Sequence, residues 1–169
     1  MSKKKFLIII VVSLFILFSL IVFIWLHIKN KGNEKLATRL YEDLIDSVIT
    51  QYLNTSYDYL SIYVDNIVDP LNKKLLSDES KKEILEYSKK YSNSVYDMRL
   101  NDLFTSEKFK DSNLTGICIS FNFNLLDYGE AYINVYSYLD NQAAKVQTYM
   151  VKYSKNNWNI SKINMEILS

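Results

Sequence analysis

The chain opens with an uninterrupted apolar stretch. From Phe6 to Leu26 every residue is Leu, Ile, Val or Phe except Ser13, Ser19 and Trp25. As a helix with a rise of ~1.5 Å per residue, this stretch is ~31 Å long, which matches a bilayer hydrocarbon core of ~30 Å. The pattern predicts one transmembrane helix over residues 6–28, with the lipid bilayer as its partner.

A second pattern with helical period begins at Glu34. Apolar residues recur there every three or four positions, as in a helix with one core-facing side, at Leu36, Leu40, Leu44, Val48 and Tyr52. After a weaker stretch at 54–57 the period returns at Leu60, Val64, Ile67, Val68 and Leu71 and predicts more helix. Asp69 followed by Pro70 resembles an N-cap with proline at the first helical position, so we expect a helix boundary there.

Another helix is expected after Ser77. Asp78 and Glu79 would lie in its first turn, where acidic residues are favourable, and the helix would run through Ile84 to Tyr91. Residues 95–104 are compatible with a short strand or a helix end.

The C-terminal part alternates between apolar and polar residues, which is typical of half-buried strands. The clearest alternating set is Ile117, Ile119, Phe121, Phe123 and Leu125. Further strands are expected over 131–139, 142–155 and 158–168, separated by a turn at 127–129 and by two-residue breaks at 140–141 and 156–157.

The register of these strands supports the assignment. The expected loops pair Phe121 with Val135, Val135 with Val146, and Val146 with Ile167, so that the apolar rows share one face. The predicted fold class is therefore α+β: an N-terminal transmembrane helix, then helices packed on one face of a curved antiparallel sheet with a four-stranded C-terminal meander.

The opposite face of the predicted sheet is polar and aromatic, with almost no charge. Interface centres are depleted in charge and enriched in tyrosine, so this face is the candidate for self-association or partner binding. Its candidate residues are Tyr132, Tyr136, Tyr149, Asn122, Asn124, Asn134, Gln147 and Asn164. The alternative is that the 14 tyrosines reflect an AT-rich coding bias.

Charge around the apolar stretch predicts its orientation. Lys3, Lys4 and Lys5 precede it, whereas Lys29 and Lys31 follow it. Positive charge concentrated in a short tail favours a cytoplasmic tail. A cleaved signal peptide would have a shorter apolar region of ~7–15 residues and an A-x-A-like site, so an uncleaved signal anchor is expected.

These observations predict the domain organisation. We expect a cytoplasmic tail at 1–5, the transmembrane helix at 6–28, a juxtamembrane linker at 29–34 and an extracytoplasmic α+β domain at 35–169, in a single-pass protein of the cell membrane. Residues 1–31 contain five lysines and no acid, so the remainder has 15 Lys+Arg against 19 Asp+Glu, a net charge of about −4. That sign argues against nucleic acid as a partner.

The sequence offers little for catalysis. The only histidine, His27, is at the membrane edge, and no Ser–His, Cys–His or zinc-binding pattern exists, so we expect no enzymatic activity, metal or cofactor. Cys118 falls on the polar sheet face and is expected to be a structural or incidental thiol rather than a nucleophile, because no partner base is visible. The polar residues predicted to face the helices are Ser137, Thr148, Lys152 and Ser161. Acids that remain as candidates for a pocket are Asp43, Asp46, Asp58, Asp65 and Asp97, whose default location is a solvated surface.

Helices followed by an antiparallel sheet, closed by the hairpin from Tyr149 through Trp158, resemble the nuclear-transport-factor-two-like (SnoaL-like) cone over residues 35–169. No catalytic motif of that superfamily is matched. With a basic tail and one membrane span, the layout is similar to VirB8-like subunits of type IV secretion and conjugation machines and to Mce-associated membrane proteins. The resemblance implies a non-catalytic assembly subunit that contacts itself and other subunits of a cell-envelope complex.

Two alternatives stay open. A small-molecule or peptide sensor would be favoured by a sizeable apolar cavity lined by a few polar groups. A pilin-like subunit would also combine a membrane helix with a sheet, but the Gly-Phe and Glu of a prepilin processing site do not follow Lys3–Lys5.

Overall fold

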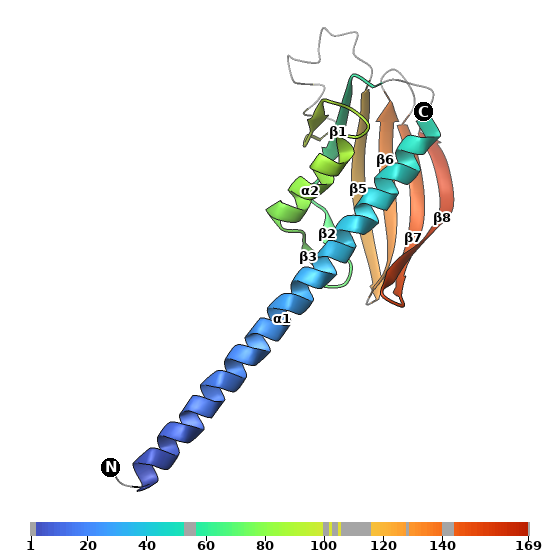
Figure 1. The fold of residues 1–169 in the computed structure, drawn as a ribbon. Helices are drawn as coiled ribbons and strands as arrows, with labels where there is room; N and C mark the ends of the chain where they lie inside the picture. The colour runs from blue at the N-terminus through green and yellow to red at the C-terminus, as the bar shows by residue number, and fades with distance from the viewer. Residues whose placement is uncertain are drawn as a thin grey trace. The chain divides into compact units, whose positions relative to one another are not determined.

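The computed structural model describes residues 3–52, 57–99, 102, 105, 116–127, 129–139 and 144–168. These residues form two compact units, 1–33 and 34–169. Helix α1 (Lys3–Ile49) contributes to both units, so residues 29–34, the expected linker, are helical. The fold is α+β, with this long helix first and a sheet after it (Figure 1).

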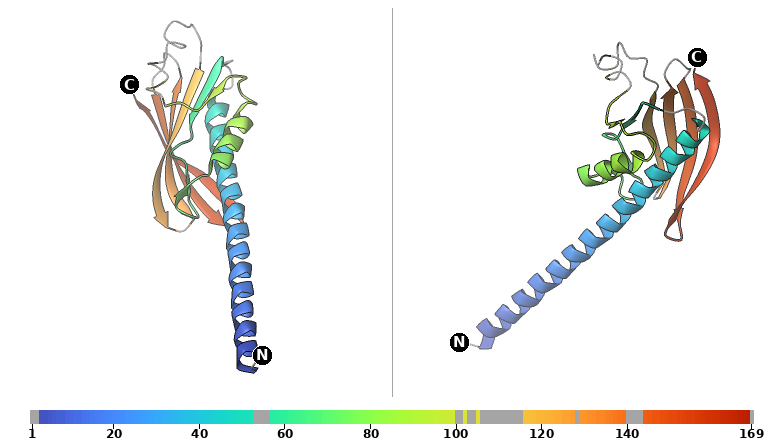
Figure 2. Two further views of the ribbon diagram at one scale, coloured as in Figure 1. Left: turned by 90° about the vertical axis from the view of Figure 1, so that its left-hand side faces the viewer. Right: turned by 45° about the horizontal axis from the view of Figure 1, so that its top comes forward.

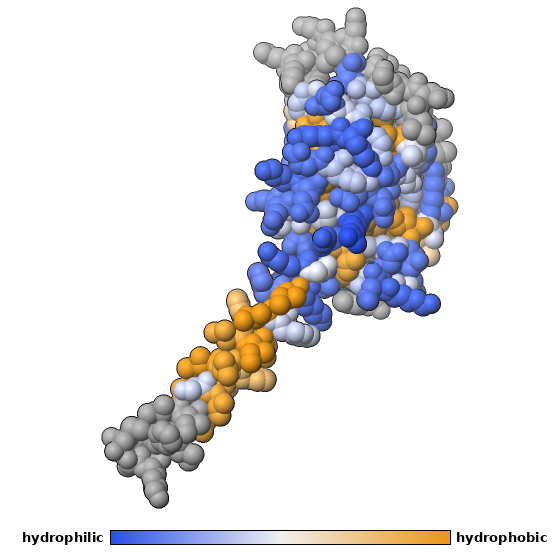
Figure 3. All heavy atoms as spheres, viewed as in Figure 1, coloured by the Kyte–Doolittle hydropathy of each residue, from blue (hydrophilic) through white to orange (hydrophobic). Residues whose placement is uncertain are grey.

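The N-terminal unit is an exposed apolar helix. Side chains from Val11 to Asn30 are exposed, and Figure 3 shows a nearly continuous apolar surface along this part of α1. Among the described residues, α1 is the one helix long and apolar enough to cross a membrane. Such a helix is compatible with a membrane anchor or a signal sequence.

The C-terminal unit uses the second half of α1 as its core helix. Leu40, Leu44 and Val48 are fully buried, as the periodic pattern predicted, together with Tyr41 and Ile45. The 3₁₀ turn η1 (Thr50–Tyr52) ends the helix. One side of this segment thus lies in protein, because its apolar residues recur with the helical period.

Helix α2 (Asp78–Ser88) begins where predicted. The Ser77 hydroxyl accepts a hydrogen bond from the Ser80 N–H at 3.3 Å, which satisfies one of the free donors of the first turn. Ile84 is fully buried. The helix ends at Ser88, before the expected Tyr91.

The predicted helical segment around Leu60–Leu71 is wrong. Residues Tyr59–Tyr63 form strand β1, and the short strands β2 (Val68–Asp69) and β3 (Lys74–Leu75) pair with each other. Leu60, Ile62 and Val64 also fit the two-residue period, and burial between two neighbouring strands selects the strand.

Asp69 caps a turn rather than a helix. Its Oδ1 accepts the Leu71 N–H at 2.8 Å and its Oδ2 accepts the Asn72 side-chain amide at 2.6 Å. An aspartate that binds the backbone two residues ahead is a common turn former, and Pro70 suits such a turn as well as a helix start.

The main sheet has six strands in the order β4-β1-β5-β6-β7-β8. Besides β1 they are β4 (Val95–Tyr96), β5 (Gly116–Asp127), β6 (Glu130–Leu139), β7 (Ala144–Ser154) and β8 (Asn157–Leu168). Strand β1 is parallel to β4 and β5, and the other pairs are antiparallel. The sheet is therefore mixed, which the expected antiparallel sheet did not include.

The predicted register holds between β5 and β6 and fails beyond them. Phe121 pairs with Val135 as expected, but Val135 pairs with Gln147 and Val146 pairs with Glu166, one residue away from the predicted partners. A shift of one residue exchanges the two faces of a strand. Thr148, Lys152 and Ser161 consequently face away from α1, contrary to the prediction, whereas Ser137 faces it.

The turns explain part of this difference. The β7–β8 hairpin turns at Lys155 and Asn156, with φ of 51° and 61°, one residue before the predicted 156–157 break. Positive φ at both positions is the geometry of a tight type I′ turn. Gly129, with φ of 65°, serves the β5–β6 turn. The predicted break at 140–141, and Tyr128, lie outside the described residues.

The core of the C-terminal unit lies between α1 and one face of the sheet, called the inner face below (Figure 2). The Tyr41 ring meets the Phe121 ring edge-on, with centroids 5.2 Å apart, and also contacts Phe123. Trp158 Nε1 donates to the Leu36 carbonyl at 3.0 Å. These contacts hold the helix on the sheet and leave the opposite, outer face free of α1.

Candidate binding site on the outer sheet face

The outer face carries most of the predicted interaction residues. Pairing aligns Asn122, Asn134, Thr148 and Asn164 in one row across four strands. The Thr148 hydroxyl donates to Asn134 Oδ1 at 2.8 Å. The predicted residues found on this face are Asn122, Asn124, Tyr136 and Asn164, all exposed, and Tyr132 and Asn134, which are half-buried.

Gln147 and Tyr149 do not belong to this face, contrary to the prediction. Each is only 1% exposed, because β7 is displaced by one residue from the predicted register. Tyr149 Oη donates to Gln147 Oε1 at 3.2 Å and lies 3.1 Å from the Ser47 hydroxyl, and Gln147 Nε2 donates to Gln51 Oε1. Both side chains thus join a buried polar cluster beneath α1.

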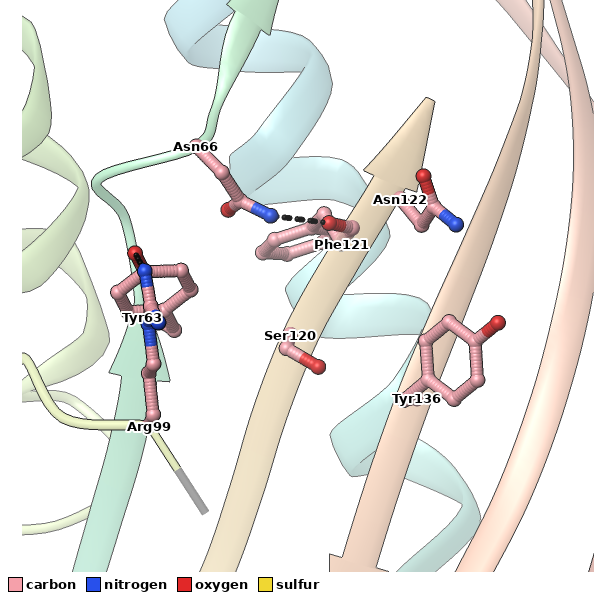
Figure 4. Close-up of a pocket in the computed structure, with 7 residues that line it drawn as sticks. All are labelled: Tyr63, Asn66, Arg99, Ser120, Phe121, Asn122 and Tyr136. Carbon is pink, nitrogen blue, oxygen red and sulfur yellow. Dashed lines mark hydrogen bonds between the residues drawn. The ribbon is translucent and has the colours of Figure 1, made fainter. Parts of the chain in front are cut away.

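A pocket of about 290 Å³ opens on the outer face. Cross-strand pairing places Tyr63, Ser120 and Tyr136 in one row over β1, β5 and β6. A small serine between two tyrosines leaves a trough, which Figure 4 shows over β5 with Tyr63 on one side and Tyr136 on the other. Its lining residues are Tyr63, Asn66, Arg99, Ser120, Phe121, Asn122 and Tyr136.

Arg99 provides the positive charge of this pocket. Its guanidinium carbon lies 4.6 Å from the centre of the Tyr63 ring, and the group donates a hydrogen bond to Tyr63 Oη. The hydrogen bond to Tyr63, with smaller effects of Asp102 and Asp65, raises the pKa of Arg99. Arg99 is therefore charged and held in place at the pocket edge.

The other lining groups are neutral. Asn66 Nδ2 donates to the Phe121 carbonyl at 2.8 Å, which fixes the turn after β1 against β5. Ser120, Asn122 and Tyr136 make no side-chain hydrogen bond within the described part of the chain. The pocket therefore presents one cation and several hydrogen-bonding groups, which suits binding rather than proton transfer near neutral pH.

Sequence reasoning found Asn122 and Tyr136 but missed the rest of this pocket. Tyr63 and Asn66 lie in the stretch whose helical period predicts a helix, and Arg99 lies in residues 95–104, which are compatible with a short strand or a helix end. Ser120 sits in the alternating pattern of β5, and its register with Tyr136 follows from the correctly predicted Phe121–Val135 pair. That register was the available signal.

Cys118 is covered. It is 5% exposed, and burial raises its pKa to about 11, only partly offset by a hydrogen bond with the Ser61 side chain. The thiol is thus protonated at neutral pH, which makes it a poor nucleophile.

The candidate acids lie in structural or surface interactions. Asp97 Oδ1 accepts the Val64 N–H at 3.1 Å, Asp65 pairs with Lys81 at 3.4 Å, and Asp43 is exposed. Asp46 accepts hydrogen bonds from Lys90 and Tyr87. In the described part of the chain no group of three or more His, Cys, Asp or Glu side chains could hold a metal ion.

Comparison with known proteins adds no relative: no family model, curated protein or solved structure matches this chain. The resemblances to the cone fold and to VirB8-like subunits therefore stay predictions.

Proposed function

We propose that this chain is a single-pass membrane protein whose folded unit is a non-catalytic assembly subunit of a cell-envelope complex, of the secretion or conjugation type. The carrying observation is the change of surroundings along α1. Apolar side chains such as Phe15, Phe18 and Phe23 are 64–72% exposed, whereas those from Leu40 to Val48 are buried in protein. Burial of apolar surface is worth about 25 cal/mol per Å², so the exposed half calls for a bilayer.

The proposed orientation rests on charge. Three lysines precede the span, and the folded unit is net negative. If Lys3, Lys4 and Lys5 stay in the cytoplasm, a single span places residues 35–169 on the extracytoplasmic side of the membrane.

A non-catalytic role is supported by what fills the space between α1 and the sheet. A cone-type active site would occupy that space, yet Tyr41, Leu44 and Ile45 fill it against Phe121 and Ile133, all at most 1% exposed. In the described part the one buried carboxylate is Asp69, whose oxygens are engaged by Leu71 and Asn72. No general acid or base is therefore presented to a ligand there.

A second candidate function is a sensor that binds a small molecule or peptide. The pocket at Arg99 and Tyr136 favours it, although the lining of this pocket is mixed in polarity and the pocket is open to the surface rather than enclosed.

Topology is tested by accessibility of single cysteines. In a Cys118→Ser background expressed in bacterial cells, Lys74→Cys, at an exposed position of β3, should react with a membrane-impermeant maleimide in intact cells. Lys3→Cys should react only after lysis. Labelling of position 3 in intact cells would invert the topology and remove the envelope proposal.

Assembly is tested by cross-linking in membranes of the native host. Tyr132→Ser combined with Tyr136→Ser should abolish cross-linked self-association or partner species while the circular dichroism stays native. Leu75→Ser is the matched control, because it removes an apolar side chain that is 61% exposed on β3 instead of the outer face. Unchanged cross-linking in the folded double variant would exclude the outer face as the contact surface.

A further inference from the structure

We propose that the pocket formed by Tyr63, Arg99, Ser120, Asn122 and Tyr136 binds a carboxylate group carried by a peptide segment. The inference deepens the assembly role and rests on it in one respect, namely that the carboxylate belongs to a protein partner. The carboxylate has two sources in a protein, a chain end or an acidic side chain, and the experiment below separates them.

The pocket exists for a local reason. Tyr63 and Tyr136 flank Ser120 in directly paired positions on the outer face, so the floor is one small side chain and the walls are two rings. The resulting volume of about 290 Å³ is large enough to admit the end of one amino-acid residue. Figure 4 shows Arg99 lying along the Tyr63 wall, on the rim of this trough.

The charge in the pocket is single and positive. Arg99 is the one charged residue in the lining, and the described residues place no carboxylate within ion-pair distance of it. Asp102 and Asp65 both raise the pKa of Arg99 through their charge, but neither lies within ion-pair distance of it among the described residues. The Asp65 carboxylate pairs with Lys81 at 3.4 Å, and Asp97 accepts the Val64 N–H. A monoanion therefore complements the site.

The single charge of the lining favours a carboxylate over a phosphate dianion. A guanidinium offers two parallel N–H donors that match the two oxygens of a carboxylate. Contact with the Tyr63 ring and the hydrogen bond to Tyr63 Oη already restrict Arg99, so little side-chain entropy is lost on binding. A phosphate dianion would require additional cations or clustered backbone N–H groups, and the lining supplies neither.

The neutral groups suit the rest of a peptide. The Ser120 and Tyr136 hydroxyls and the Asn122 amide carry no other side-chain hydrogen bond in the described part. An amide donates and accepts at once, which is the complement of a peptide bond.

The experiment uses the full-length chain in detergent micelles and ligand-observed NMR by saturation transfer. The probes are N-acetyl-alanine, with a chain-end carboxylate, and N-acetyl-glutamate α-amide, with a side-chain carboxylate. N-acetyl-alanine amide lacks the carboxylate, and methyl phosphate tests a different anion. At least one carboxylate probe should bind, with the amide and the phosphate binding at least tenfold more weakly; the preferred carboxylate probe identifies the source.

Variants locate the binding. Arg99→Gln should weaken binding of the carboxylate probe at least tenfold, and Arg99→Lys should restore only part of the lost affinity. Ser120→Val, which fills the trough with a residue suited to a strand, should also weaken it. Arg39→Gln is the matched control: it removes the same charge from an exposed position of α1 and should leave binding unchanged.

Three outcomes overturn the inference: no binding of either carboxylate probe, equal binding of the amide or phosphate, or unchanged binding in folded Arg99→Gln and Ser120→Val chains. Each of these leaves the assembly role intact, because that role is tested by cross-linking without any probe. Conversely, if a carboxylate probe binds but no cross-linked partner is found, the pocket is a carboxylate site and the claim that a protein partner carries the carboxylate is wrong.

Discussion

The inner and outer faces of strands β5–β8 come from one alternating sequence but meet different surroundings. Phe121 and Ile133 on the inner face are at most 1% exposed and pack under α1, whereas Asn122 and Tyr136 on the outer face remain exposed. Tyrosine occurs on both faces: Tyr149 is buried in a polar cluster, and Tyr136 forms a pocket wall. Residue type alone therefore does not assign a tyrosine to core or to binding; the register does.

The largest expected difference between the faces comes from Phe121 and its neighbour Asn122. Phe121→Ala should lower the free energy of unfolding by about 3–5 kcal/mol, because it leaves a cavity opposite Val135 and Tyr41. Asn122→Ala, one residue further on the outer face, should change it by less than about 0.5 kcal/mol. Urea unfolding of residues 33–169, which contain the compact unit, measures both. Similar losses for the two variants would contradict the assignment of the faces.

A pair of tyrosine variants sharpens the comparison at single-atom level. Tyr149→Phe removes a buried hydroxyl that bonds Gln147 and Ser47, and should cost about 1–2 kcal/mol because Gln147 Oε1 loses a donor. Tyr136→Phe makes the same change on the outer face, where the hydroxyl has no such bond, and should stay within about 0.5 kcal/mol. Both variants are measured in the same unfolding assay. If both had wild-type stability, the hydrogen bonds of Tyr149 to Gln147 and Ser47 would not stabilise the fold.

A smaller and pH-dependent effect is expected in the helices that cover the inner face. Partial burial alone would raise the pKa of Asp46, but hydrogen bonds from Lys90, Tyr91 and Tyr87 lower it. A lowered pKa contributes stability above the unfolded value of about 3.9, and this stability is lost as the pH falls through the folded value. Asp46→Asn should therefore cost about 0.5–1 kcal/mol at pH 7, a figure limited by solvent screening, and less below about pH 3.

Asp43→Asn is the control, because the pKa of Asp43 is shifted in the opposite direction from that of Asp46. Asp43 is exposed overall but its carboxyl is partly covered, and this partial burial, followed by the charge of Asp46, raises the pKa of Asp43. Its ionised form is therefore unfavourable in the folded chain, and its contribution to stability improves as the pH falls. At pH 7 the urea midpoint of Asp46→Asn should lie below that of wild type and the midpoint of Asp43→Asn above it, and both differences should shrink at pH 3. Parallel shifts would mean that the hydrogen bonds to Asp46 do not contribute.

Much of the architecture was predictable from local pattern. Length and hydropathy predicted the exposed apolar helix, the helical period predicted burial of Leu40, Leu44 and Val48, and Ser77 with its acidic successors predicted the start of α2. Each of these signals depends on neighbours within a few residues, which is the range over which backbone geometry fixes side-chain direction.

The candidate site was less predictable, since its residues come from three separate segments. Asn122 and Tyr136 were found because the Phe121–Val135 register was correct. Tyr63 was missed because Leu60 and Val64 fit the helical period as well as the strand period, and Arg99 because its segment carries no clear period. Only pairing of β1 with β5 brings Tyr63 beside Ser120.

By itself the sequence determined the apolar helix, the helical stripe that follows it, the start of α2 and the first hairpin register, because hydrophobic periodicity and capping act locally. Only the tertiary structure decided that residues 59–63 form a strand and that the Tyr149 and Gln147 side chains of β7 point to the inner face. It also decided that Arg99 lies against the Tyr63 ring, at one end of the row Tyr63, Ser120 and Tyr136. The physical reason is that two strand registers one residue apart form equivalent backbone hydrogen bonds, so local interactions do not distinguish them. The register is selected by how well the side chains of each sheet face pack against α1.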